Sequence, residues 1–236
     1  MSSLNLAPAY RVVVSEFAET PPEAIERNMS LTEVSPPDPA ALSSREAIVA
    51  IRSVAVGWVD LLMTSGQYQH MPKPPYTPGL ESAGEVVWAG ADAGVSLGAR
   101  VIVDGMLAGP RSLGPYQGAG GFQSYIVAPG NALRPIPGSL TFDQAAALLG
   151  SYETAYHCLV TRGRLAAGET VLIHGATGAT GLAAVQIAKL LGATVIATGR
   201  SEAKLAVVKA HGADHVLAIG QVDGIRPFRD DVKALT

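Results

Sequence analysis

The residues whose types and spacing point to chemistry lie between Thr170 and Arg200. An apolar run, Val171 to Ile173, enters a turn that contains three glycines. The turn passes into a segment with apolar residues at the three-to-four spacing of a helix that packs one face on a sheet. A second apolar run, Thr194 to Ala197, follows at once. The stretch therefore predicts a βαβ crossover of about thirty residues.

The turn in this crossover matches the dinucleotide fingerprint G-x-G-x-x-G, with alanine in place of the first glycine. Gly178 would let the backbone approach a pyrophosphate, and Gly181 would let the helix pack closely on the strand. The free N–H groups and the dipole at the start of the helix attract an anion. We expect the turn to hold a dinucleotide through Ala176, Thr177, Gly178, Ala179, Thr180 and Gly181.

The choice of dinucleotide depends on a position 19 residues past Gly181. An Asp or Glu at that position would bind the ribose 2′-hydroxyl of NAD. This chain has Arg200 there, followed by Ser201 and Lys204, and Glu202 is the only carboxylate nearby. A guanidinium, a hydroxyl and an ammonium suit a 2′-phosphate, so we predict NADPH. The alternative is that Arg200 and Lys204 are solvated charges of a loop and a helix start.

Composition and charge point to a small-molecule partner. The chain has 236 residues, with 17 basic and 20 acidic side chains and a formal net charge of −3. No run of Lys or Arg suggests a nucleic acid or an anionic membrane as partner. Its one cysteine, Cys158, excludes an intrachain disulfide and a multi-cysteine zinc site, which fits a reducing compartment. We see neither a signal peptide nor a membrane span, and expect a cytoplasmic protein.

The two halves of the chain differ in pattern, which predicts two domains, 1–138 and 139–236. The first half is rich in β-strand signals with proline- and glycine-bearing links. Between its first two strands we expect a polar, proline-bearing connection, without regular structure at Ser35 to Leu42 because of Pro36, Pro37 and Pro39. We also expect a short helix at Val59 to Met63 and a featureless surface loop from Gly105 to Gly121. The strands are expected at 10–15, 46–56, 81–88, 100–104 and 122–127.

The second half predicts one half of a doubly wound parallel sheet. Helices are expected at 141–149, 154–165, 202–211 and 230–236, and the third parallel strand at 214–219. The sequence ends where a fourth strand is expected. The strand Val171 to Ile173 would then be an open edge, and we expect the chain to be a fragment of a longer protein.

The order of these parts, with several motifs, resembles the medium-chain dehydrogenase/reductase superfamily and, within it, the zinc-free, zeta-crystallin-like quinone oxidoreductases. The resemblance covers the whole chain. It implies a GroES-like β domain and a Rossmann domain, with the active site in the cleft between them. The matching segments are Gly57–Met63, Gly66–Tyr68, Pro78–Glu81, Gly84–Val86, Gly120–Phe122, Tyr152–Tyr156 and the ATGATG turn.

The resemblance also bears on the metal. Zinc-dependent members place a ligand His where this chain has Leu80, and no cysteine precedes Cys158. The five histidines show no cluster of the three or four ligands that zinc needs. We therefore expect no metal-binding residue. Without a Lewis acid, hydride transfer from NADPH to a quinone or an α,β-unsaturated carbonyl remains.

Individual residues carry further expectations. Tyr68 occupies the place of a proton-donating tyrosine in related enoyl-thioester reductases, so it is the candidate general acid. The alternative is a half-buried aromatic, and quinone reduction needs no protein acid. Thr154 matches a residue near the nicotinamide. Asp60 is expected to be a structural hydrogen-bond acceptor, and His174 and Cys158 are expected to be core residues.

Three possibilities stay open at this point. The acceptor could be an enoyl thioester instead of a quinone or enone. The chain could also be a non-enzymatic NADPH-binding or interaction module, because its Rossmann sheet is incomplete. A homodimer is compatible with the pattern but is not indicated by any particular residue.

Overall fold

The computed structural model of the chain describes residues 6–221 and 224–236. They form two compact units that divide between Ala147 and Leu148. The first unit includes α3 (Phe142–Ala146), which packs on two strands of its sheet. The domain boundary expected after residue 138 stays a prediction. No helix of the described residues is long and apolar enough to span a bilayer.

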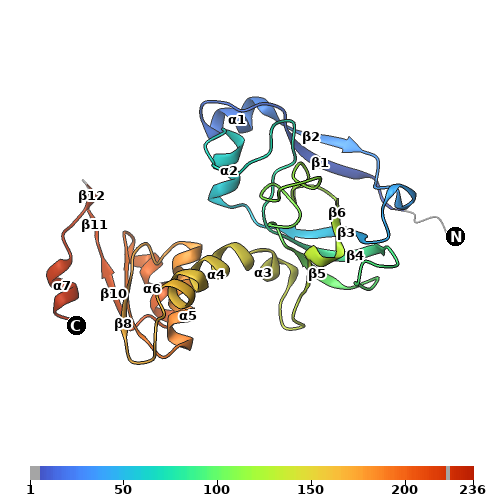
Figure 1. The fold of residues 1–236 in the computed structure, drawn as a ribbon. Coiled ribbons are helices and arrows are strands. Elements are labelled where there is room, and N and C mark those ends of the chain that lie inside the picture. The colour runs from blue at the N-terminus through green and yellow to red at the C-terminus, as the bar shows by residue number, and fades with distance from the viewer. Residues whose placement is uncertain (1–5, 222–223) are drawn as a thin grey trace. The chain divides into compact units, whose positions relative to one another are not determined.

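The first unit is built on a five-stranded antiparallel sheet in the order β6-β3-β4-β5-β7, which gives it the expected GroES-like architecture (Figure 1). Alternate strand residues such as Val49, Val86 and Val101 are buried in its core, as the period of two in a strand requires. The strands are β3 (Glu46–Val54), β4 (Ser82–Ala89), β5 (Arg100–Val103), β6 (Tyr125–Pro129) and β7 (Leu133–Pro135).

Beside this sheet, β1 (Ala9–Val14) pairs antiparallel with β2 (Met29–Val34). Two elements in the connection after β1, α1 (Pro21–Asn28) and β2, were not predicted, and the stretch 35–42 that was expected to lack regular structure contains one 3₁₀ turn, Pro39–Ala41. Thr20 caps α1 by accepting the Glu23 N–H through its hydroxyl. Prolines occupy the first turn of α1, where the backbone N–H groups have no acceptor within the helix. The missing N–H of proline therefore costs no helical hydrogen bond at this position.

Segment 105–121 contains no helix or strand, as expected, yet it is not simply a surface loop. Ala108 and Ser112 are each 3% exposed. The Tyr116 hydroxyl donates a 2.7 Å hydrogen bond to the Glu46 carboxylate on β3. The segment is therefore fixed on the sheet at several points. A short helix, α2 (Trp58–Thr64), lies at the predicted place.

The second unit contains a three-stranded parallel sheet in the order β10-β9-β8, the expected Rossmann arrangement (Figure 1). Helices α5 and α6 pack on it, and α5 buries Ala183, Val185 and Ala188. Among the described residues, β8 has β9 as its one neighbour. The strands are β8 (Thr170–Ile173), β9 (Thr194–Gly199) and β10 (His215–Ala218), and the helices are α4 (Leu149–Tyr156), α5 (Ala179–Leu190) and α6 (Glu202–Ala210).

Two features of the second unit were not expected. Helix α4 continues into a wider π-helical turn, His157–Arg162. After β10, the short strand β11 (Gly220–Gln221) pairs antiparallel with β12 (Gly224–Ile225). The next element, α7 (Arg229–Lys233), was expected. The predicted strand at 214–219 and helix at 230–236 correspond to β10 and α7.

Candidate functional site

The glycine turn lies at the carboxyl end of β8, next to the carboxyl end of β9. Ala176 is fully buried, and its N–H donates a 3.0 Å hydrogen bond to the Thr198 carbonyl on β9. Gly175 has a φ of +63°, a left-handed conformation that favours glycine. Gly178 is the N-cap of the twelve-residue helix α5. The turn therefore directs the start of α5 toward the edge where ligands bind in parallel sheets.

The two glycines of the fingerprint differ in what the fold demands of them. A Cβ on Gly181 would lie 2.5 Å from the Gly175 carbonyl oxygen and 2.6 Å from Ala176 Cα, so the fold requires glycine there. A Cβ on Gly178 would have Gly175 O as its nearest neighbour, at an ordinary 3.6 Å. Within the described chain nothing excludes a side chain at Gly178, which leaves its free face for a ligand.

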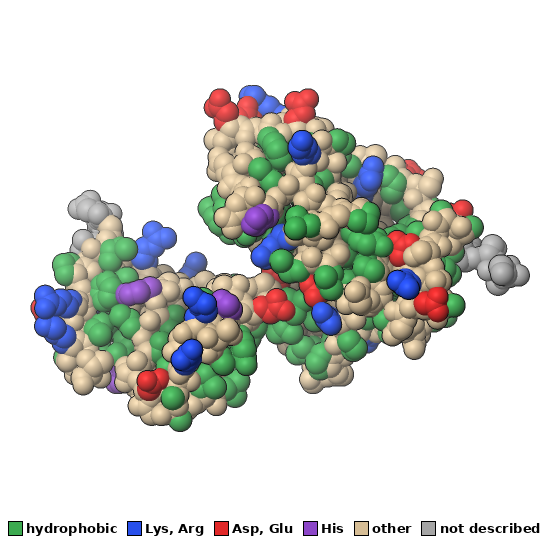
Figure 2. All heavy atoms as spheres, in the orientation of Figure 1, with side chains coloured by type: hydrophobic (Ala, Val, Ile, Leu, Met, Phe, Trp, Pro, Cys, Tyr) green, Lys and Arg blue, Asp and Glu red, His purple; other side chains and the backbone are tan. Residues whose placement is uncertain are grey.

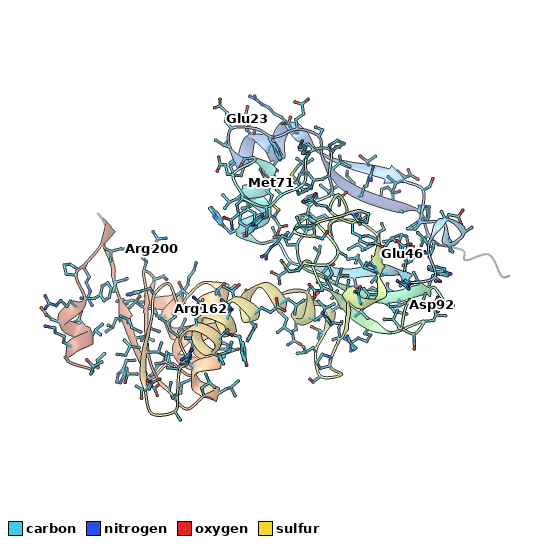
Figure 3. All side chains as sticks on the ribbon, in the orientation of Figure 1. Glu23, Glu46, Met71, Asp92, Arg162 and Arg200 are labelled. Atoms are coloured by element: carbon cyan, nitrogen blue, oxygen red, sulfur yellow. The ribbon has the colours of Figure 1, made fainter. Side chains whose placement is uncertain are left out.

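Arg200 and Ser201 follow β9 at the same edge of the sheet. Figure 3 labels Arg200 in the loop after β9, and Figure 2 shows basic side chains at that place. The Ser201 hydroxyl accepts the Lys204 N–H at 3.4 Å and caps α6. Arg200 and Lys204 are exposed, and in the described part of the chain neither forms a salt bridge. Both cations are therefore free to meet an anion.

Two further glycines, which the sequence analysis did not single out, hold this edge together. A Cβ on Gly199 would lie 2.8 Å from the Thr177 methyl group, so the turn and the end of β9 are in close contact. A Cβ on Gly220 would lie 2.3 Å from the Arg200 carbonyl oxygen. The sequence signal for both was a glycine directly after an apolar strand, which marks close approach of another backbone.

Nine of the predicted residues thus lie at one edge of the second unit. Of these, Thr177, Gly181 and Ser201 are half-buried, and Gly178, Ala179 and Thr180 are exposed at the start of α5. The tenth, Thr154, is exposed on α4, and its hydroxyl donates a 2.6 Å hydrogen bond to the Gly150 carbonyl. Helix α4 packs on α5, the helix that follows the glycine turn. The place of Thr154 near a nicotinamide stays a prediction.

Tyr68 belongs to the first unit, in the segment after α2. It is half-buried and packs against a small apolar cluster of Val14, Met63 and Tyr76. Leu80 packs against the same cluster. According to the resemblance described above, zinc-dependent dehydrogenases have a ligand histidine at this position. The candidate acid and the residue that replaces a metal ligand therefore share one apolar environment.

Asp60 on α2 joins three backbone segments, as expected of a structural acceptor. Its Oδ2 accepts the Gly57 N–H at 2.9 Å, and its Oδ1 accepts the N–H groups of Gly79 and Leu80, each at 3.1 Å. The side chain is buried, and this burial raises the pKa of the carboxyl although the three N–H donors act to lower it. Asp60 fixes Leu80 relative to the start of α2.

Two expectations about core residues were wrong. Cys158 is exposed and lies in the π-helical turn, so it is not a core residue. His174 is exposed as well, because β8 ends at Ile173 and His174 already belongs to the turn. Its Nδ1 lies 3.2 Å from the Thr198 hydroxyl, and its ring meets Phe228 edge-on at 5.4 Å.

No group of three or more His, Cys, Asp or Glu side chains in the described residues could hold a metal ion. At Leu80 the side chain is hydrocarbon, and the neighbouring carboxylate, Asp60, accepts three backbone N–H groups and is a single potential ligand. The donor set around Leu80 therefore does not fit a catalytic zinc, which needs three protein ligands.

Comparison with known families agrees with both units. Residues 43–138 match the alcohol dehydrogenase GroES-like domain, and residues 179–236 match the zinc-binding dehydrogenase family. The chain belongs to the medium-chain dehydrogenase/reductase superfamily. The second match covers α5, β9, α6 and β10, the elements around the glycine turn.

Relatives within this superfamily place the chain in its quinone oxidoreductase-like branch. A quinone oxidoreductase-like protein 2 homolog of Nematostella vectensis is 38% identical over 83% of the chain and 50% of its own length. A quinone oxidoreductase of Pongo abelii is 32% identical over 78% of the chain and 54% of its own length. The chain thus spans about half the length of the curated relatives it matches.

A solved structure supports the same placement. The quinone oxidoreductase of Thermus thermophilus, determined alone and in complex with NADPH, superimposes with a TM-score of 0.67. It is 29% identical, and the match covers 88% of this chain and 59% of that one.

Proposed function

We propose that the chain is the part of an oxidoreductase that binds NADPH and that, without zinc, the enzyme transfers hydride to a quinone or an α,β-unsaturated carbonyl. One observation carries the proposal: an open helix start and two unpaired cations lie at the same edge of the parallel sheet. The similarity to a quinone oxidoreductase that was solved with NADPH supports it.

The residues of the turn would each have a separate task in holding the cofactor. Gly178 leaves room for the pyrophosphate, and the first N–H groups of α5 donate to it. Arg200, Ser201 and Lys204 would hold the 2′-phosphate, with the Arg200 guanidinium able to form a bidentate contact. Bound NADPH supplies a hydride, and the chain's part is to orient the nicotinamide and exclude water.

The proposed acceptor chemistry is supported by features of the first unit. Zinc independence is supported by Leu80 and by the lack of a cluster of potential metal ligands in the described residues. A quinone or an enone disperses the arriving negative charge by conjugation, so neither needs a Lewis acid. Tyr68 would donate the proton that an enone or an enoyl thioester requires after hydride arrival.

The cofactor claim is tested by equilibrium titration of NADPH and NADH against the wild type and Arg200→Ala. Loss of one charge-assisted hydrogen bond costs about 1.5–3 kcal/mol, or about a 10- to 150-fold rise in Kd for NADPH. NADH binding should not change. Arg162→Ala, which removes an exposed arginine from the π-helical turn of the same unit, is the matched control. Equal affinity for both cofactors, unchanged by Arg200→Ala, would contradict the proposal.

Catalysis is tested separately from binding. Turnover of a quinone and of an enone is measured for the 236-residue chain with NADPH. Intact NADPH binding without turnover of either acceptor would favour the non-enzymatic module. Light scattering of the same sample tests the homodimer, and fractionation of cells tests the predicted cytoplasmic location.

A further inference from the structure

Tyr76 has a buried hydroxyl that the fold leaves unused. The residue is 2% exposed, and its backbone exchanges two hydrogen bonds with Val14, at 2.9 and 3.1 Å. Its ring lies in the cluster with Val14 and Met63, against which Tyr68 and Leu80 pack. The hydroxyl oxygen has no hydrogen-bond partner among the described residues. A buried hydroxyl without a partner is destabilising, so native proteins usually supply one, often a water molecule.

Asp60 is a buried carboxylate bonded to a residue that packs against the same cluster. Met63, which packs with Tyr76, follows Asp60 by one turn of α2. Leu80, which packs against the same cluster, donates its N–H to Asp60. Burial raises the pKa of the Tyr76 phenol, and the charge of Asp60 raises it further, which agrees with a short separation of the two groups.

The carboxylate also has capacity for another donor. An ionised carboxylate offers about four lone-pair sites. Oδ1 accepts two N–H groups, whereas Oδ2 accepts one, from Gly57. A water molecule can accept from the Tyr76 hydroxyl and donate to Oδ2, which meets the minimum of two polar partners for a buried water.

We infer that Tyr76 and Asp60 together bind one internal water molecule, and that this hydrated pair keeps Gly57 and Leu80 in fixed positions. Tyr76 is then a positioning residue and not a catalytic one. The water site itself does not depend on the proposed function. Only the relevance of the positioned Leu80 to hydride transfer rests on that function.

The first test is Tyr76→Phe, which removes a single oxygen atom. If the hydroxyl holds a water on Asp60, the thermal midpoint should fall by about 2–4 °C near neutral pH, the shift expected for one lost hydrogen bond in a chain of this size. Tyr10→Phe is the control, because Tyr10 is 44% exposed and its hydroxyl has no hydrogen bond within the described chain. An unchanged or higher midpoint for Tyr76→Phe would show that the hydroxyl makes no stabilising hydrogen bond, and would overturn the inference.

The pH dependence separates this role from simple packing. A donor to the carboxylate favours its charged form, so Tyr76→Phe should raise the pKa of Asp60 further. The midpoint loss should be full where Asp60 is ionised and should shrink near pH 4, where more of Asp60 is protonated. A loss of equal size at both pH values would contradict the link to Asp60. The other titratable groups near Asp60 lie on α1, which packs on α2, and in the segment between α2 and β4. They are Glu23, Glu26, Arg27, Tyr68, His70, Lys73 and Glu81.

Comparing each variant with the wild type at the same pH cancels the titration of those groups. A double-mutant cycle of Tyr76→Phe with Asp60→Asn measures the coupling directly, and additive effects would also contradict the inference. These readouts need neither NADPH nor an acceptor. A protein that does not bind NADPH could therefore still show the effects expected of the water site. Conversely, results that contradict the water site would not contradict NADPH binding.

Discussion

Replacing Gly178 with alanine should weaken NADPH binding strongly while leaving the unliganded protein almost as stable as the wild type. The Cβ would have an ordinary 3.6 Å contact to the Gly175 carbonyl. Gly178 has φ −86° and ψ 167°, which alanine adopts without strain. Alanine is a less favourable N-cap than glycine, which lowers the unfolding free energy by about 0.5–1 kcal/mol. Alanine also reduces the conformational entropy of the unfolded chain, which raises the unfolding free energy by about 0.4–1 kcal/mol. The net change in unfolding free energy is thus below about 1 kcal/mol.

For NADPH the same methyl group occupies the space that the pyrophosphate needs. Displacing the pyrophosphate from even one backbone N–H would cost about 1.5–3 kcal/mol, or about 10- to 150-fold in Kd. The measurement is a fluorescence titration with NADPH, beside a thermal unfolding curve without it. A Gly178→Ala protein that binds NADPH as tightly as the wild type would refute the assignment of this turn.

Gly181→Ala provides the contrast within the same turn. Its Cβ would lie 2.5 Å from Gly175 O and 2.6 Å from Ala176 Cα, and neither backbone atom can move away cheaply. Overpacking typically costs about 1–3 kcal/mol, and we expect the upper end of that range here. The midpoint without NADPH should then fall by about 6–12 °C. A Gly181→Ala protein as stable as Gly178→Ala would show that the turn is not packed as described.

Two further predictions concern the acceptor and the second unit. Tyr68→Phe should slow enone reduction and spare quinone reduction, measured as kcat for each acceptor, because only the enone needs a proton from the protein; equal effects on both would remove the proposed role. Asp214→Asn should destabilise the chain by about 0.5–1 kcal/mol at neutral pH, because the half-exposed Asp214 accepts from Lys189 Nζ at 2.8 Å and from the Val195 N–H at 2.7 Å. The Lys189 bond, and then the Val195 N–H, lower the pKa of Asp214, so this stabilisation is present above the unfolded pKa and is lost as the pH falls through the folded one; a difference from the wild type that persists in strong acid would contradict it.

The parts of the fold that local patterns determine were predicted well. The strand, turn and helix around Gly178 follow from periodicity and from glycine chemistry, and each lies within a few residues of its predicted place. Helix α1 was not predicted, and this too has a local reason: proline interrupts the interior of a helix but is favoured in its first turn, where α1 has it. His174 was misplaced by one step, since the strand ends at Ile173.

Other features depend on contacts between distant segments, and no local pattern contains them. The hydrogen bond between Tyr116 and Glu46 spans 70 residues and fixes a loop that the sequence describes only as glycine-rich. The exposed Cys158 lies where α4 changes into a π-helical turn, a change that hydrophobic spacing does not indicate. The Tyr76 hydroxyl has no hydrogen-bond partner among the described residues, and only the complete surroundings of the side chain reveal this.

The structure also separates two roles that the fingerprint combines. Sequence matching assigns Gly178 and Gly181 to one motif, yet the fold itself requires only Gly181. Gly178, Arg200 and Lys204 share a different property: the described chain makes no demand on the free face of the glycine or on the two charges. We propose that one ligand explains these three residues together. At this edge the proposed ligand would be anionic at two places, the start of α5 and the end of β9, as a phosphorylated dinucleotide is.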